Sequence, residues 1–168
     1  MARIAIFLAT ALIVGIIERM IPFDFVVPGV KLGLSNVVIL TAIYIFDFPS
    51  VLILVVLKCV VLALLSGSVT SFFYSLCGSM LSFLIMWCMV KLFEKKEKLG
   101  PVGVSAVGAV FHNFGQIIAA SLIFKTLNVA AYLPVLIVSG VITGVLVGFA
   151  VKFSMPYVKK FLGRQACI

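Results

Sequence analysis

Long apolar stretches alternate with short polar or Gly/Pro-containing breaks along almost the whole chain. Six apolar stretches can be delimited, at residues 3–21, 32–46, 49–66, 69–92, 102–124 and 132–153. A helix needs about 20 apolar residues to cross the hydrocarbon core of a bilayer. The pattern therefore predicts an all-α integral membrane bundle of six transmembrane helices in a single domain (1–168). Because the second stretch is short, we expect its helix to span incompletely or to pack inside the bundle.

The composition points to the same class of protein. Hydrophobic residues make up 64% of the chain, charged residues only 11%, and the mean hydropathy is +1.36. Soluble domains usually carry about 25% charged residues. The first stretch is interpreted as a retained helix rather than a signal peptide, because it lacks a small-x-small cleavage site and runs into Glu18 and Arg19. The four cysteines show no pair spacing, which favours reduced packing residues over disulfides or metal ligands.

The formal net charge of +8 is explained by membrane orientation rather than by nucleic-acid binding. Six crossings place both termini on one side, which then carries nine basic residues: Arg3, Lys91, Lys95, Lys96, Lys98, Lys152, Lys159, Lys160 and Arg164. The other side carries three: Arg19, Lys31 and Lys125. Lys and Arg accumulate on the cytoplasmic side of membrane proteins, so both termini are predicted to be cytoplasmic. The basic and aromatic tail 154–168 is expected to lie at the interface.

Small residues recur at helical spacing on three of the predicted helices. Gly140, Gly144 and Gly148 share one face, which favours close packing within the chain over dimerisation. Ala5 and Ala9 are also four apart, and either pack within the bundle or form a flat surface for another membrane subunit. The fourth helix carries a serine stripe that indicates either close packing or the wall of a polar cavity: Ser68, Ser71, Ser75, Ser79 and Ser82.

Polar side chains at bilayer depth are the strongest functional signal. Lys58 and His112 both fall near the middle of apolar helices, where a charge costs roughly 2.5–3.5 kcal/mol on insertion scales. A pocket open to the exterior is predicted, lined by Lys58, His112, Asn113, Gln116, Asn36, Glu18, Arg19, Ser75, Ser79, Ser139 and Thr143. Other roles stay open, since Glu18 and Arg19 also suit interface anchors and Asn36 a helix cap. Lys58 and a protonatable His112 favour an anionic or strongly hydrogen-bonding ligand.

The sequence does not support catalysis. Its five acidic residues form no Asp-Asp-x-x-Asp run for a magnesium diphosphate, and no Walker loop is present. A single histidine offers no multi-histidine metal site. We therefore expect no catalytic residues, no metal and no cofactor.

Three runs of residues resemble the signatures of a known membrane family. They are Pro28-Gly29-Val30-Lys31-Leu32-Gly33-Leu34-Ser35-Asn36, then 101–105 with Gly108 and His112-Asn113-Phe114-Gly115-Gln116, and finally 132–134 with Ser139-Gly140 and Thr143-Gly144. The chain is identified by resemblance as a member of the family labelled heptaprenyl diphosphate synthase component I, also called the Gx transporter family. That family is similar to the substrate-binding S components of energy-coupling-factor (ECF) transporters.

The resemblance implies an S-component fold in a bacterial cell membrane, with an outward-facing site. It implies that the loops after helices one, three and five close over the ligand, and that Ala5 and Ala9 dock on a membrane T subunit. It also implies two cytoplasmic ATPases as partners. One departure from the family pattern is Lys58, where Arg is expected, so charge is kept without bidentate geometry.

Two functions follow from these observations. The preferred one is substrate capture for an ECF-type ABC importer of a small organic nutrient, such as an anionic or aromatic quinone or isoprenoid precursor. The alternative is a non-catalytic membrane partner of a prenyl- or quinone-synthesising enzyme. An autonomous membrane enzyme is the least supported, because paired catalytic groups are missing from the sequence.

Overall fold

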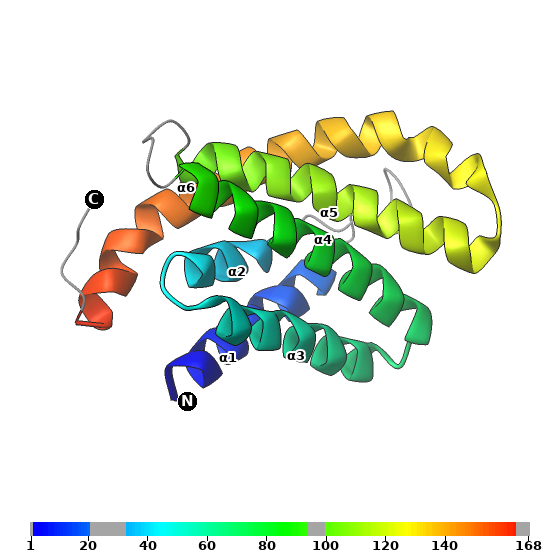
Figure 1. The fold of residues 1–168 in the computed structure, drawn as a ribbon. Coiled ribbons are helices and arrows are strands. Elements are labelled where there is room, and N and C mark those ends of the chain that lie inside the picture. Colours follow the sequence, from blue (N-terminus) through cyan, green and yellow to red (C-terminus); the bar gives the residue numbers. More distant parts are fainter. Residues whose placement is uncertain (1, 21–32, 94–99, 164–168) are drawn as a thin grey trace.

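The computed structural model describes residues 2–20, 33–93 and 100–163, and they are almost entirely helical (Figure 1). The elements in chain order are α1 (Ala2–Met20), α2 (Asn36–Ile43), α3 (Phe48–Ser66), α4 (Val69–Phe93), α5 (Pro101–Phe124), the 3-10 helix η2 (Leu127–Tyr132) and α6 (Leu133–Phe161). No strand occurs in these three ranges. The all-α prediction therefore agrees with the structure.

Proline and glycine set most of the helix ends. Proline occupies the first turn of α3, α5 and α6, where its missing N–H has no intrahelical partner to lose. Helix α3 ends at Gly67, whose φ of 60° is left-handed and whose N–H bonds to the carbonyl of Leu64. This turn reverses the chain directly into α4.

Within the described residues, four helices are long and apolar enough to cross a membrane, in the ranges 48–66, 69–92, 101–124 and 128–161. This supports a membrane protein but not the six crossings that the sequence predicted. The predicted second helix, 32–46, is corrected to the eight residues Asn36–Ile43. Eight residues rise only about 12 Å, well short of the roughly 30 Å of hydrocarbon. Seven of the eight are buried, so α2 is an internal helix.

The expected end of the last helix is also corrected. Helix α6 does not stop at 153 but continues through Pro156 to Phe161. A proline inside a helix gives up one hydrogen bond and membrane helices tolerate it, so the residue did not mark the boundary. Much of the tail that was expected at the interface is thus a helical extension, and 164–168 lie outside the described residues.

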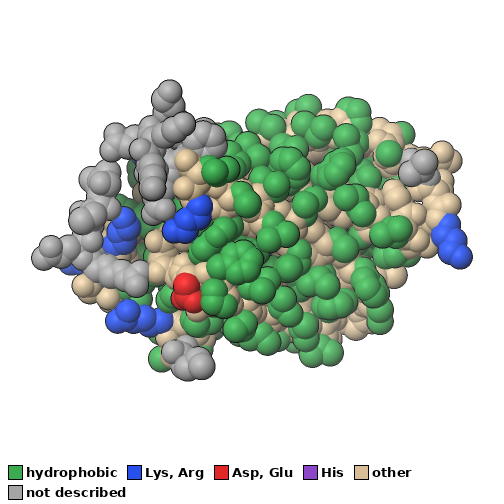
Figure 2. Space-filling model, in the orientation of Figure 1, with side chains coloured by type: hydrophobic (Ala, Val, Ile, Leu, Met, Phe, Trp, Pro, Cys, Tyr) green, Lys and Arg blue, Asp and Glu red, His purple; other side chains and the backbone are tan. Residues whose placement is uncertain are grey.

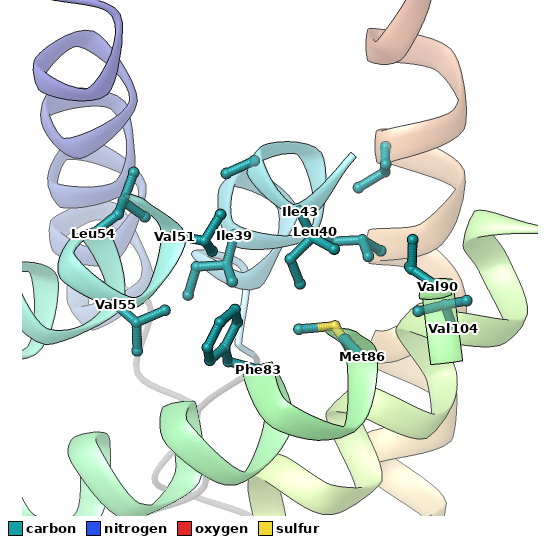
Figure 3. Packing of buried hydrophobic residues seen from close by; sticks show 12 residues of the cluster. Ile39, Leu40, Ile43, Val51, Leu54, Val55, Phe83, Met86, Val90 and Val104 are labelled. Carbon is teal, nitrogen blue, oxygen red and sulfur yellow. The ribbon is translucent and has the colours of Figure 1, made fainter. Parts of the chain in front are cut away.

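Helices α3, α4, α5 and α6 follow one another as antiparallel neighbours, and α1 packs beside α3 (Figure 1). The short helix α2 touches all five of the others. Its residues Ile39, Leu40 and Ile43 lie at the centre of a hydrophobic cluster that includes Phe83 and Met86 (Figure 3). The other residues of the cluster come from the first half of α3, the second half of α4, the start of α5 and the part of α6 that packs beside it. This half of the bundle is therefore solid.

The glycine face of α6 packs against α5, as the intramolecular alternative predicted. A Cβ at Gly144 would lie 2.6 Å from the Cα of Ala106, and one at Gly148 would lie 2.4 Å from the Cα of Val102. Backbone atoms cannot move aside as a flexible side chain can, so only glycine permits this approach. The three glycines are thus used inside the chain.

The outer surface suits a lipid environment. Hydrophobic side chains cover the face shown in Figure 2, and Lys and Arg gather at the ends of the molecule, chiefly where the termini lie. Helix α6, for example, exposes a long series of apolar side chains: Val135, Val138, Val141, Ile142, Leu146, Phe149 and Phe153. Soluble monomers rarely show apolar surface of this extent. The described residues therefore form a membrane protein with charged ends.

Candidate functional site

A small polar cavity lies in the half of the bundle that α2 does not fill. Four helices and one turn converge on it: the end of α1, the turn before α2, and the middle parts of α3, α4 and α5. Its lining residues are Gly15, Glu18, Gly33, Ser35, Lys58, Leu62, Ser75, Ser79 and His112. The free volume is about 30 Å³, enough for one or two water molecules. Residues from distant parts of the sequence thus share one chamber.

Lys58 is the buried cation of this cavity, with only 2% of its surface exposed. Its Nζ donates to the Oγ of Ser35 and to the Oγ of Ser79, each at 3.2 Å. An ammonium group has three N–H donors, so one is left without an acceptor among the residues that the structure describes. Snorkelling to the interface is ruled out for this side chain because its Nζ is held inside the bundle.

Glu18 is the buried anion of the same cavity. Its carboxylate accepts the backbone N–H of Gly33 at 2.5 Å and that of Ser35 at 3.5 Å. Gly33 has a φ of 69°, which suits glycine at the turn that aims these N–H groups. Glu18 is 8% exposed, so the role of an interface anchor does not fit it. The side chain of Arg19 lies outside the described residues.

Helix α5 contributes His112 to the cavity. Its Nε2 lies 3.3 Å from the Nε2 of Gln116, one helical turn further on. Gly78 of α4 allows the approach, because a Cβ there would lie 2.9 Å from the carbonyl oxygen of His112. Gln116 is buried and supports the imidazole rather than lining the cavity.

The serine stripe of α4 serves both of the roles proposed for it. Ser75 and Ser79 line the cavity, while Ser82 is fully buried where α4 packs against Gly108 of α5. Ser68 lies near the start of the helix and bonds to the hydroxyl of Thr70 and the N–H of Ser71. The stripe is therefore part cavity wall and part helix contact.

Besides Gln116 and Asn36, three further predicted pocket residues do not line the cavity. The Nδ2 of Asn113 donates to the carbonyl of Leu136 on α6 at 2.7 Å, and Asn113 borders a separate apolar cavity of about 330 Å³. Ser139 and Thr143 donate to carbonyls of their own helix, those of Leu136 and Gly140. All three side chains hold helices together or satisfy backbone groups.

Asn36 is the first residue of α2 and is 5% exposed. It does not cap the helix: Ser35 precedes α2 as the cap residue, without a side-chain cap bond. Its Nδ2 lies 3.0 Å from where a Cβ on Gly33 would stand, and its Oδ1 has no partner among the described residues. Asn36 is therefore not one of the residues that line the cavity, although it contacts Gly33, which is.

Sequence reasoning missed Gly15 and Leu62, which complete the cavity wall. A Cβ on Gly15 would lie 2.8 Å from Leu62, so the glycine lets α1 approach α3. The position of Gly15 could have been found from helical spacing, because Gly15 is three residues before Glu18 and lies on the same face of the helix.

Several other predictions concern the outside of the bundle. Ala5 and Ala9 are exposed on α1. An apolar groove of about 400 Å³ lies between α1, α2 and α6, and Ile6, Tyr157 and Phe161 are among its lining residues. Of the three loops expected to close over a ligand, residues 21–31 lie outside the described part, and η2 occupies the third. Cys59, Cys77 and Cys88 are free thiols, while Cys167 is not described.

Fold and site together define an all-helical membrane protein with an internal polar cavity. The chain belongs to the family described as heptaprenyl diphosphate synthase component I, which matches residues 7–154. The predicted family is thereby confirmed. No curated protein and no solved structure matches the chain. The family description names a component of a synthase, and so fits the alternative function better than the preferred one.

Proposed function

We propose that this protein is a membrane-embedded binding subunit that captures a small molecule by its polar end, in the manner of the S component of an ECF-type importer. The observation that carries the proposal is the shared cavity of Lys58, Glu18 and His112, which reach it from three different helices. On this proposal both termini face the cytoplasm and the ligand enters from outside. A T subunit and two ATPases then drive its release.

Energetics support a binding role for the cavity. Burying an ammonium group in an apolar bundle costs several kcal/mol after relaxation. Lys58 recovers part of this through two serine hydroxyls and through the nearby carboxylate of Glu18. A purely structural site would gain from an apolar residue of the same size. The N–H of Lys58 that has no acceptor among the described residues is suited to a ligand oxygen.

The cavity's size limits what it can hold in this state. Pockets for organic ligands usually measure about 300–1,000 Å³, against about 30 Å³ here. We therefore infer that the cavity takes a polar head group and that the bundle opens to admit the rest. Helix α1 is the natural moving part, because among the described elements it packs only on α2 and α3.

The second candidate function is a non-catalytic membrane partner of a prenyl- or quinone-synthesising enzyme. The family description supports it, since it names component I of a prenyl diphosphate synthase. Co-purification distinguishes the two functions. ABC-type ATPases bound to the affinity-purified protein support import, and a bound prenyl synthase supports the partner role.

A double variant tests the binding site itself. Lys58→Ala with His112→Ala is expected to abolish ligand binding while the bundle still folds. The measurement is native mass spectrometry of the purified protein, looking for a retained small molecule. Lys152→Ala, which removes an exposed lysine of α6, is the matched control. Retention of the same molecule by the double variant would remove this cavity from consideration.

A further inference from the structure

The charged groups of the cavity balance one another. Among the described lining residues, Lys58 and Glu18 are the ones that carry a full charge, and the charges are opposite. With a neutral His112, the formal charge of the part of the wall that the structure describes is zero. A ligand group that carries net charge would therefore stay uncompensated in a low-dielectric site, which is costly.

The two charged groups also differ in what they can still bond. The ammonium of Lys58 keeps one N–H beyond those given to Ser35 and Ser79. Each carboxylate oxygen of Glu18 accepts one backbone N–H and has a second lone pair. The cavity thus offers a donor on its α3 wall and acceptors on its α1 wall.

We propose that the head group held in the cavity carries no net charge, accepts a hydrogen bond from Lys58 and donates one to Glu18. An α-amino-acid type zwitterion is the simplest group with these properties. The proposal rests on the binding function proposed above and narrows its ligand. The sequence favoured an anionic or a strongly hydrogen-bonding ligand, and the proposal keeps the second of these, because Glu18 and Lys58 line the same cavity.

A diphosphate head does not meet these requirements. It carries several negative charges, against one lysine whose charge is offset by Glu18. The cavity is therefore not a site for the head of a prenyl diphosphate, whichever protein partner the chain has.

The test uses four small probes of different charge with the purified full-length protein in detergent. Glycine is the zwitterion, glycolate the anion, ethanolamine the cation, and inorganic diphosphate the multiply charged anion. The midpoint of thermal unfolding, measured against probe concentration, gives an apparent affinity for each. Glycine is expected to bind the wild-type protein about tenfold or more tightly than the other three, since one uncompensated buried charge costs at least that factor.

Two variants shift the charge balance in opposite directions. Glu18→Gln keeps an oxygen for the N–H of Gly33 and leaves Lys58 uncompensated, so the preferred probe becomes glycolate. Lys58→Met leaves Glu18 uncompensated, so the preferred probe becomes ethanolamine. Lys152→Met, on the exposed side of α6, is the control that leaves the order of affinities unchanged.

The outcomes separate this inference from the function on which it rests. If glycolate or diphosphate binds the wild-type protein best, the neutral head group is refuted and the binding function stands. If no probe binds any variant, the cavity is not a binding site and both fail. Should a variant not fold, the order of affinities in the wild-type protein still decides.

Discussion

Replacing Lys58 with methionine separates a binding role from a folding role for the buried amine. Methionine has a similar length and volume and no charge, so it fills the same space between α3 and α4. The substitution removes the two hydrogen bonds to Ser35 and Ser79, each 3.2 Å long. It also removes the requirement to keep an ammonium group out of water.

The two effects are of similar size and opposite sign. A hydrogen bond to a charged group contributes roughly 1.5–3 kcal/mol, so the pair contributes about 3–6 kcal/mol. A lysine at the centre of a membrane helix costs roughly 2.5–3.5 kcal/mol on insertion scales. The freed serine hydroxyls can bond to carbonyls of their own backbone. Made together with Glu18→Gln, so that no buried carboxylate is left uncompensated, the substitution is expected to change the free energy of unfolding by less than about 2 kcal/mol, while ligand binding is lost.

Thermal and denaturant unfolding in detergent measure the first quantity, and native mass spectrometry of the retained molecule measures the second. Lys152→Met serves as control, because that lysine is exposed on α6 and lines none of the described cavities. A loss of more than about 3 kcal/mol, the range typical of breaking a buried ionic contact, with the molecule still bound would refute the reasoning. Lys58 would then be a structural residue.

Three further substitutions test the separate roles of other residues. Asn113→Leu breaks the bond between α5 and α6 and should lower the unfolding free energy by about 1–3 kcal/mol without changing ligand affinity; a lost affinity would return Asn113 to the binding site. Gly144→Leu forces a side chain against the backbone of α5 and should destabilise by about 1–3 kcal/mol or more, whereas Gly100→Ala, with no atom within 4 Å of the added Cβ, should not; equal stabilities in denaturant unfolding would contradict the packing argument. Ala5→Trp with Ala9→Trp should leave binding intact and block uptake in cells, and persisting uptake would place the docking face elsewhere.

Helix boundaries that coincide with proline or glycine could be predicted from the sequence. The predicted ranges 49–66, 69–92 and 102–124 each lie within one residue of α3, α4 and α5. The second helix was predicted too long, because hydropathy does not distinguish a lipid-facing residue from one buried in protein. The last was predicted too short because the basic and aromatic residues after 153 were interpreted as an interfacial tail. In both cases tertiary packing decided the length.

The sequence predicted how deep in the membrane each site residue lies, but not toward which neighbouring helix its side chain points. Lys58, His112 and Glu18 stood out because polar groups are rare in apolar helices, and the structure brings all three to one cavity. Asn113 lies at the same depth, but one residue further corresponds to about 100° around the helix, which turns it toward α6. Which neighbour occupies that direction depends on the packing of α5, which the sequence alone does not specify. The sequence did place Glu18 in the same pocket as Lys58, but the alternative of an interface anchor stayed open until the packing of α1 was known.

The placement of α2 has a consequence for the electrical properties of the membrane. A water-filled path from the cavity to the opposite end would have to pass through Ile39, Leu40 and Phe83, each at most 1% exposed. Hydration of such a path would require these closely packed apolar side chains to move apart. The short helix therefore raises the barrier to water and ions between the cavity and the opposite end of the described bundle.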